Sequence, residues 1–259
     1  MKERQEHRTK SASAKTRIDK LLLDRGLAPS RERAQALILA GKVLVNQQKV
    51  EKPGSAVAAD SEVRILGEDQ RYVSRGGIKL EHALRHWKID VNGKTCMDVG
   101  ASTGGFTDCL LQHGAAHVIA LDTGYGQMDA RLRNDSRVHL LERTNARYLN
   151  AGYLKDDQIA ETMDIVAIDV SFISVTLVLP AVVQASHPGE VIILVKPQFE
   201  VGRDQVGKGG IVRDAKARQA AVEKVREAVA ALGARDIEST DSPIPGAEGN
   251  HEYLLHARF

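Results

Sequence analysis

The segment DVGASTGGF, residues 98–106, decides the fold because it joins the end of an apolar run to a glycine-rich turn. A strand followed by such a turn and a helix begins a nucleotide-binding α/β unit. In a dinucleotide-binding turn, the second glycine lets the backbone approach a pyrophosphate closely. Here Ser102 holds that position, between Gly100 and Gly105. The turn therefore favours a cofactor without a phosphate at this point; a plain turn without a ligand is the alternative.

The rest of the C-terminal part alternates apolar runs with segments long enough for crossover helices. Continuous Val, Ile and Leu runs indicate strands buried on both faces, as in a parallel sheet covered by helices. The longest expected helix spans residues 213–233 and precedes the last two strands. The seven expected strands are residues 95–99, 117–122, 137–141, 164–170, 191–197, 234–240 and 251–259. This pattern resembles the class I (Rossmann-like) methyltransferase architecture, an α/β fold with a mostly parallel seven-stranded sheet and an antiparallel last strand.

The composition limits the class of protein. The longest nearly apolar stretch, residues 175–185, is short and contains Pro180, so we expect no membrane-spanning helix and no membrane partner. The N-terminal sequence MKERQEHRTK lacks the apolar core of a secretory signal. Cys96 and Cys109 fit neither a disulfide framework nor a metal site. These features predict a reduced, cytoplasmic protein without a bound metal.

Charge is distributed unevenly along the chain. Residues 1–88 carry 19 Lys and Arg against 11 Asp and Glu, whereas residues 89–259 carry 17 against 23. A basic N-terminal part on an acidic remainder indicates that the N-terminal part binds a polyanion. A lysine-rich tail that only aids solubility is the alternative.

The basic part contains a small module at residues 17–66. Gly26 is expected to end a first short helix, Ser30 to cap a second one, and Gly41 to end it, before short strands follow. Residues 1–16 have no periodicity and are expected to form a disordered basic tail. Residues 67–74 are expected to be a linker, and residues 75–259 to form the second domain.

Residues 17–66 resemble the small α+β alpha-L RNA-binding domain of a small-subunit ribosomal protein, pseudouridine synthases and tyrosyl-tRNA synthetases. The matching positions are Arg17, Asp19, Leu22, Ser30, Arg31, Ala34, Gly41, Val43, Val45 and Asn46. An unrelated helix-turn-helix on a basic surface is the alternative. In this module we expect RNA contacts, chiefly to phosphates, from Arg17, Arg25, Arg31, Arg33 and Lys42.

Two carboxylates bracket the glycine turn. Asp98 ends the first strand and is suited to an ammonium group, and Asp122 ends the next strand, where an acidic residue can hold ribose hydroxyls. S-adenosylmethionine meets both conditions, since it has a ribose, an amino-acid tail and no phosphate. The expected cofactor contacts are Asp98, Gly100, Ser102, Gly104, Gly105, Phe106 and Asp122.

Two lysines and two carboxylates are expected at the same edge of the sheet. Asp169 and Lys196 follow strands, Glu252 starts the antiparallel strand, and Lys79 shortly precedes the first strand. A lysine held among carboxylates can stabilise the negative charge that develops on a hydroxyl oxygen, and a neutral lysine can accept its proton. The protonation state of the lysines stays open. Taken singly, each residue has another explanation, such as a surface charge, a helix cap or an ion-pair partner.

Eight motifs resemble the TlyA family of ribosomal RNA 2'-O-methyltransferases, which joins an alpha-L domain to an FtsJ-like methyltransferase domain. The motifs are SRGGIKL (74–80), DVGASTGGFTDCLL (98–111), LDTGYGQ (121–127), ERTNARYL (142–149), AIDVSFIS (167–174), LVKPQFEVG (194–202), KGGIVRD (208–214) and GNHEYLL (249–255).

The resemblance implies methyl transfer from S-adenosylmethionine to the 2'-hydroxyl of cytidines in ribosomal RNA, within ribosomal subunits. It implies that Lys79, Asp169, Lys196 and Glu252 form the catalytic set. Asn145 and Ala146 are expected to contact the adenine ring, with a plain surface turn as the alternative. We interpret residues 199–214, rich in glycine, as a mobile loop that touches phosphates, with an ordinary long loop as the alternative.

Other functions stay open at this point: a non-catalytic RNA-binding protein, a membrane-acting haemolysin, or a methyltransferase for small molecules. The tetrad argues against the first, the lack of a membrane helix against the second, and the basic module against the third. The sequence leaves open which nucleotide and ribosomal subunit are modified, and the oligomeric state.

Overall fold

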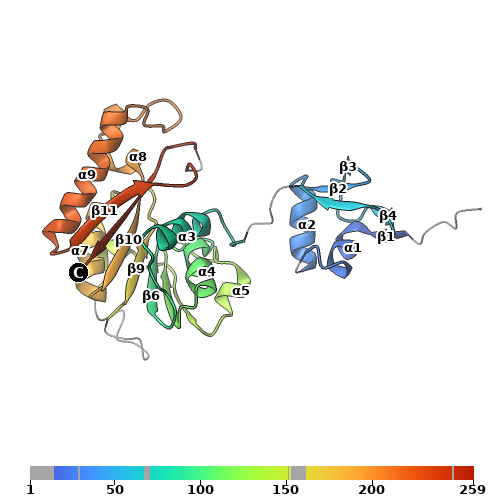
Figure 1. Ribbon diagram of the computed structural model, residues 1–259, viewed down its shortest axis with the longest axis horizontal. Coiled ribbons are helices and arrows are strands. Elements are labelled where there is room, and N and C mark those ends of the chain that lie inside the picture. The colour runs from blue at the N-terminus through green and yellow to red at the C-terminus, as the bar shows by residue number, and fades with distance from the viewer. Residues whose placement is uncertain (1–14, 29, 67–70, 151, 153–161, 247) are drawn as a thin grey trace, which may run out of the picture. The chain divides into compact units, whose positions relative to one another are not determined.

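The chain divides into two units, Met1–Asp69 and Gln70–Phe259. The structure is a computed structural model that describes residues 15–28, 30–66, 71–150, 152, 162–246 and 248–259 (Figure 1). Within these ranges, no helix combines the length and apolar character needed to cross a bilayer.

Seven strands form one sheet in the C-terminal unit. They are β6 (Thr95–Val99), β7 (His117–Leu121), β8 (Val138–Leu141), β9 (Ile165–Ile168), β10 (Glu190–Val195), β11 (Arg235–Asp241) and β12 (Tyr253–Arg258). Their order is β11-β12-β10-β9-β6-β7-β8. The neighbours from β10 to β8 pair in parallel, whereas β12 is antiparallel to both β10 and β11. The expected mostly parallel sheet with an antiparallel last strand is confirmed.

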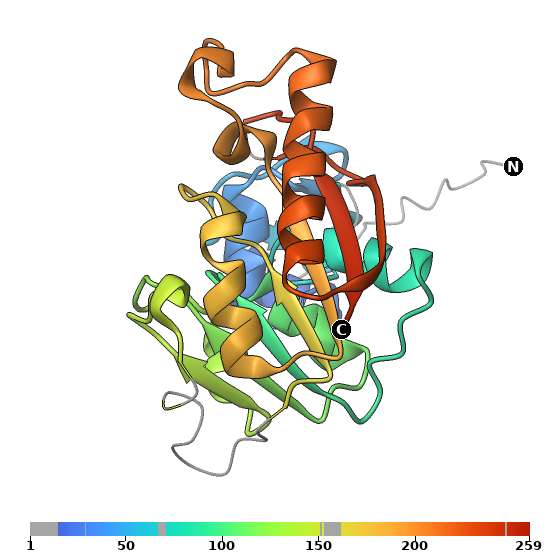
Figure 2. The same ribbon diagram turned by 90° about the vertical axis from the view of Figure 1, so that its left-hand side faces the viewer.

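Helices cover both faces of this sheet. They are α3 (Gly76–His86), α4 (Gly105–Gln112), α5 (Ala130–Arg133), α7 (Leu179–Ser186), α8 (Pro197–Glu200) and α9 (Ala215–Ala231), with 3₁₀ turns η1 (Ala146–Tyr148), η2 (Val175–Leu177) and η3 (Arg203–Gln205). Helices α7 and α9 pack with the core of one face, and α3, α4 and α5 with the core of the other. Figure 2 shows α7 and α9 across the same face of the sheet.

Strand β6 shows why both faces need helices. Its side chains alternate, so Met97 and Val99 belong to one hydrophobic cluster and Cys96 to the other. Since these three side chains are fully buried, the strand has no solvated face. A continuous apolar run in the sequence is the direct result.

The segment before α3 belongs to the C-terminal unit. The expected linker covered residues 67–74, of which residues 67–70 lie outside the described residues. Tyr72 is 2% exposed and packs in the same cluster as α3 and α4, and the Val73 amide donates to Asp108 Oδ2 at 2.8 Å. Residues 72–74 therefore form part of the folded unit. The polar residues before Tyr72 favour a linker, but the free energy gained by burying its ring stabilises this segment against α3 and α4.

The N-terminal unit contains two helices and two small sheets. Its elements are β1 (Lys15–Arg17), α1 (Ile18–Asp24), α2 (Arg31–Leu39), β2 (Val43–Val45), β3 (Gln48–Lys49), β4 (Ala56–Ala58) and β5 (Val63–Ile65). Strands β1 and β4 pair antiparallel, and β3, β2 and β5 form the second sheet. Ser30 Oγ accepts a hydrogen bond from the Arg33 amide at 3.2 Å, as expected of an N-cap.

The first strand of this unit begins at Lys15, whereas the module was expected to begin at residue 17. Of the tail expected at residues 1–16, residues 1–14 lie outside the described residues. Lys15 and Thr16 are part of β1, where they pair with Ala58 and Val57. A three-residue strand is too short for a sequence pattern to reveal, because its pairing partner lies about 40 residues away.

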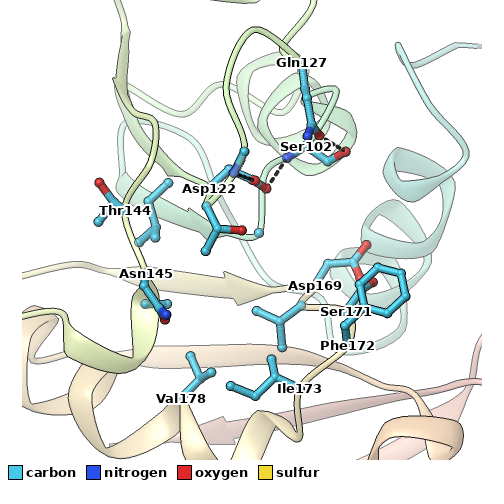
Figure 3. Close-up of a pocket in the computed structure, with 16 residues that line it drawn as sticks. Ser102, Asp122, Gln127, Thr144, Asn145, Asp169, Ser171, Phe172, Ile173 and Val178 are labelled. Carbon is cyan, nitrogen blue, oxygen red and sulfur yellow. Dashed lines mark hydrogen bonds between the residues drawn. The ribbon is translucent and has the colours of Figure 1, made fainter.

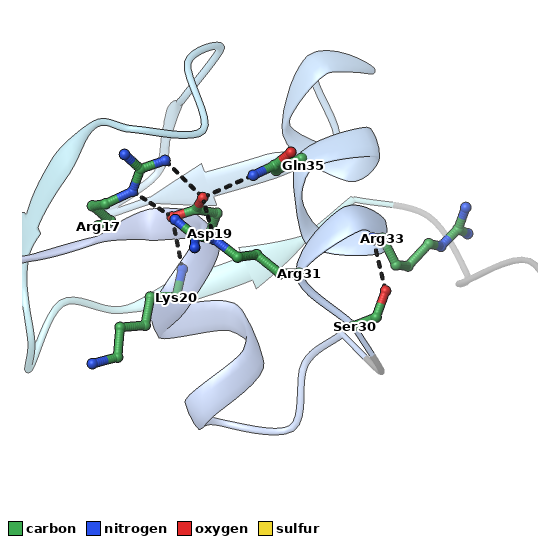
Figure 4. A network of polar contacts seen from close by, with 7 residues as sticks. All are labelled: Arg17, Asp19, Lys20, Ser30, Arg31, Arg33 and Gln35. Atoms are coloured by element: carbon green, nitrogen blue, oxygen red, sulfur yellow. Dashed lines mark hydrogen bonds and ion pairs between the residues drawn. The ribbon is translucent and has the colours of Figure 1, made fainter.

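A buried carboxylate links the two helices of the N-terminal unit (Figure 4). Asp19 at the start of α1 is fully buried. It accepts hydrogen bonds from Arg17 Nη2 at 2.8 Å, from Arg31 Nε at 3.1 Å and from Gln35 Nε2 at 3.1 Å. The Arg17 guanidinium holds the pKa of Asp19 well below its usual range, against the effect of burial. Because Arg31 and Gln35 lie on α2, this carboxylate fixes α2 against α1.

We expect Asp19→Asn to lower the stability of the N-terminal unit by about 2 kcal/mol at pH 7, since it removes the charge that both half-exposed arginines share. The folded-state pKa of Asp19 is depressed, so the contribution of the carboxylate is present above about pH 4 and is lost as the pH falls further. Hydrogen exchange of residues 15–66 at pH 7 and at pH 3 measures both effects. Equal exchange in the wild type and the variant at pH 7 would contradict the assigned role.

Candidate active site

Two adjoining cavities lie at the carboxyl edge of the parallel strands. Their volumes are about 380 Å³ and about 270 Å³. Four residues line both: Gly100, Ser102, Asp169 and Ser171. They follow β6 and β9, which are neighbours at the point where the strand order reverses. This is the position at which open α/β sheets bind ligands.

The larger cavity combines one carboxylate with apolar walls. Figure 3 shows Asp122 beside Ser102, with Asn145 on one side and Ile173 and Val178 below. Asp122 Oδ2 accepts from the Ser102 amide at 2.9 Å and Oδ1 from the Gly124 amide at 2.6 Å. These bonds fix the carboxylate at the end of β7, and its remaining lone pairs suit sugar hydroxyls. The apolar walls suit a flat ring.

The turn after β6 tolerates a serine for a geometric reason. Ser102 adopts a positive φ of 48°, and its hydroxyl bonds to Gln127 Oε1 at 3.2 Å. The side chain is therefore engaged with a neighbouring loop rather than with the turn itself. Gly100 does not tolerate a side chain, because its φ is +89° and a Cβ would lie 2.5 Å from the Asp169 carbonyl oxygen.

The smaller cavity contains a buried acid. Asp98 is fully buried, and its Oδ2 accepts from the Thr107 amide at 2.9 Å and from Thr107 Oγ1 at 2.7 Å. Its Oδ1 has no hydrogen-bond partner among the described residues. Burial raises the pKa of Asp98 to about 7. A buried carboxylate oxygen without a partner, in a residue that lines a cavity, is suited to a cationic group such as an ammonium.

Two lysine–carboxylate pairs stand at this cavity. Lys196 Nζ lies 2.5 Å from Asp169 Oδ1, and Lys79 Nζ forms an ion pair with Glu252. The side chains of Lys79 and Glu252 are almost entirely buried, whereas those of Lys196 and Asp169 are 12% and 22% exposed. A buried, paired lysine keeps a fixed direction, since its ammonium has few other partners.

The strand arrangement explains why the four residues meet. Lys79, Asp169 and Lys196 line the smaller cavity, and Glu252 reaches it through its pair with Lys79. In the antiparallel pairing of β10 and β12, Val195 is opposite Tyr253. Lys196, which follows β10, and Glu252, which precedes β12, therefore lie at the same edge.

Eight of the nine expected cofactor residues line a cavity: Asp98, Gly100, Ser102, Gly105, Phe106, Asp122, Asn145 and Ala146. Gly104 lines neither. It adopts a φ of +94° at the start of α4, and a Cβ there would lie 2.3 Å from Leu132 Cδ1. Packing against Leu132 by itself requires a glycine here, and a cofactor contact of Gly104 stays a prediction.

The sequence analysis did not single out three polar residues around the cavities. Thr107 holds Asp98, Gln127 binds Ser102, and Ser171 Oγ accepts a hydrogen bond from Lys196 Nζ at 2.8 Å. All three lie inside motifs already quoted, but only the fold shows which of the motif residues face the cavities.

The five basic residues expected to contact RNA all lie in the N-terminal unit. Arg17 and Arg31 are half exposed and held by Asp19, while Arg33 and Lys42 are partly buried. Arg25 also has a structural role, since its guanidinium donates to the carbonyls of Ala59 and Ser61 at 2.5 and 2.8 Å.

Comparison with known proteins agrees with this architecture. Residues 72–259 match the family model of FtsJ-like methyltransferases, and residues 16–63 match that of the S4 domain, the alpha-L fold expected there.

Relatives match over most of their length. The chain is 47% identical to "16S/23S rRNA (cytidine-2'-O)-methyltransferase TlyA" of Mycobacterium tuberculosis, covering 94% of this chain and 90% of the relative. It is 42% identical to "Hemolysin A" of Brachyspira hyodysenteriae, over 93% and 98% of the two chains. A solved structure from Streptococcus thermophilus, described as a hemolysin, is 40% identical, with a TM-score of 0.71 over 94% and 88% of the two chains.

The match thus covers the glycine turn, both lysine–carboxylate pairs and the basic N-terminal module together. The chain therefore belongs to the FtsJ-like methyltransferase family, with an N-terminal S4 domain and with TlyA among its relatives.

Proposed function

We propose that this protein transfers a methyl group from S-adenosylmethionine to the 2'-hydroxyl of a cytidine ribose in ribosomal RNA. The observation that carries the proposal is the pairing of Lys196 with Asp169 and of Lys79 with Glu252 beside a cavity that continues into a nucleoside-sized one. The activity in the name of the Mycobacterium tuberculosis relative supports the same reaction.

The residues present fit this cofactor. Asp98 offers a buried carboxylate oxygen to the ammonium of the methionine part, and Asp122 offers its carboxylate to the ribose. Asn145 and Ala146 border the apolar part of the larger cavity, where the adenine ring would lie. When bound, S-adenosylmethionine supplies an electrophilic methyl group on a sulfonium.

The lysines handle the proton and the charge of the ribose hydroxyl. Lys196 Nζ donates a hydrogen bond to Ser171 Oγ and forms an ion pair with Asp169, and the side chain lines the smaller cavity, where a substrate oxygen would lie. In this position Lys196 stabilises negative charge on the 2'-oxygen, or accepts its proton when neutral. Lys79 lines the same cavity, and Glu252 holds its ammonium in place.

The S4 domain gives the RNA a place to bind before the reaction. Arg17 and Arg31 present half-exposed guanidinium groups, which suit backbone phosphates. The substrate in this proposal is ribosomal RNA within ribosomal subunits, and the protein acts in the cytoplasm.

Lys196→Ala should lower the rate of methyl transfer by about 10²–10⁴-fold, because it removes the group that handles the hydroxyl proton. The Kd for S-adenosylmethionine should change by less than about threefold. Labelled methyl donor with separated ribosomal subunits, followed by mapping of ribose methylation, measures the rate. Lys94→Ala is a matched control, since Lys94 also faces a carboxylate, Glu190, at 3.8 Å, but lies before β6. Full activity of Lys196→Ala would refute its catalytic role.

The affinity for S-adenosylmethionine should rise with pH through about 7. Below this value the Asp98 carboxyl is protonated and neutral, so pairing it with an ammonium requires release of its proton. The Kd should then increase by up to about tenfold for each unit of pH below 7. Calorimetry between pH 5.5 and 7.5 measures this dependence, and Asp98→Asn should bind more weakly with a flatter profile. An unchanged profile in the variant would exclude Asp98 as the titrating group.

Deletion of residues 1–69 should abolish methylation of ribosomal RNA while leaving the Kd for S-adenosylmethionine within about threefold of the full chain. The C-terminal unit has its own core and contains both cavities. Cofactor binding serves as the folding control. Retained methylation of ribosomal subunits would show that the S4 domain does not deliver the substrate.

A further inference from the structure

The segment after β9 touches the segment after β10 at several points. At the sheet edge, Lys196 Nζ forms an ion pair with Asp169 and donates a hydrogen bond to Ser171 Oγ. Further along, the Phe172 and Phe199 rings lie 5.5 Å apart between centroids. These contacts hold residues 169–175 against residues 196–200, which we call the paired loops.

A buried carboxylate, that of Glu200, connects the paired loops at the end away from Lys196. The side chain of Glu200 is 2% exposed. Its Oε1 accepts from the Val175 amide at 2.7 Å, and its Oε2 accepts from Ser174 Oγ at 2.5 Å and from Lys224 Nζ at 3.2 Å. A fully partnered buried carboxylate is a rigid link, since breaking it would leave a charge without compensation.

The backbone between the Lys196 contacts and the Glu200 contacts is strained at Phe172. Phe172 has a φ of +66°, a region that costs free energy for a residue with a bulky side chain. The side chain is 92% exposed, so its own burial does not offset that cost. The contacts of Glu200 on one side and of Lys196 on the other hold this strained loop in one conformation.

Ser171 is the residue through which the loop meets the catalytic lysine. It lines both cavities, and its hydroxyl accepts a hydrogen bond from Lys196. Figure 3 shows it beside Asp169 on one side of the larger cavity. The ion pair with Asp169 holds the ammonium at the cavity, and the hydrogen bond to Ser171 Oγ gives it a direction. Without Ser171, the ion pair would still hold the ammonium but would not fix its direction.

We propose that Ser171 is a positioning residue that sets the direction of the Lys196 side chain, and that Glu200 holds the Ser171 loop in place. This inference rests on the proposed function, because its effect is on methyl transfer. The inference adds the Ser171 hydroxyl to the Lys196–Asp169 ion pair as a hydrogen-bond acceptor. It also gives the buried Glu200 carboxylate the role of holding the Ser171 loop.

Ser171→Ala should lower kcat by about tenfold or more, since a small error in the placement of a reacting group is costly. The KM for ribosomal subunits and the Kd for S-adenosylmethionine should stay within about twofold. Ser171→Thr keeps the hydroxyl and should restore most of kcat. Glu200→Gln should lower kcat by a smaller factor, and the Ser171→Ala/Glu200→Gln double variant should be no slower than Ser171→Ala alone.

Ser239→Ala is the matched control, because this exposed serine on β11 bonds to Arg226; its kcat should equal that of the wild type. Thermal unfolding of each variant separates positioning from loss of folding. Wild-type kcat in Ser171→Ala, a loss that appears in KM alone, or failure of Ser171→Thr to restore kcat would overturn the proposal. An inactive wild-type protein would instead overturn the proposed function, and the role of Ser171 with it.

Discussion

The close approach of two backbone segments at Gly100 is the constraint on which the site depends. A Cβ at this position would overlap the Asp169 carbonyl, so the ends of β6 and β9 meet only because residue 100 is glycine. The two cavities adjoin at this contact, since Gly100 and Asp169 line both. The glycine turn and the Asp169 carboxylate are therefore parts of one junction rather than two separately placed loops.

The antiparallel strand supplies what a wholly parallel sheet would lack. In a parallel sheet every strand ends at the ligand edge, and its start lies at the opposite edge. Because β12 runs the other way between β10 and β11, its first residues face the site, and Glu252 becomes available to Lys79. The second lysine–carboxylate pair thus depends on strand direction as much as on residue identity.

Much of this arrangement could be predicted from the sequence, because buried parallel strands appear as continuous apolar runs with polar residues at their ends. The positions of Asp98, Asp122, Asp169 and Lys196 follow from that rule, and that of Glu252 follows from the direction of the last strand. Lys79 lies on α3, so its place at the cavity depends on how that helix packs. Gly104 shows the limit of the rule, since the sequence does not distinguish a glycine that packs against Leu132 from one that lines a cavity. Tyr72 and the Ser171–Lys196 bond depend on how loops pack, and loop packing has no periodic signal.

The N-terminal unit shows a different use of a buried charge. Asp19 binds the guanidinium groups of Arg17 and Arg31 while about half of each arginine side chain is exposed. Long side chains of this kind ordinarily give up considerable rotational freedom when they are immobilised on a partner. Here that freedom is already restricted by Asp19 in the unliganded fold. A polyanion that docked on these two arginines, as proposed, would therefore meet a smaller entropic penalty than on two unrestrained surface arginines.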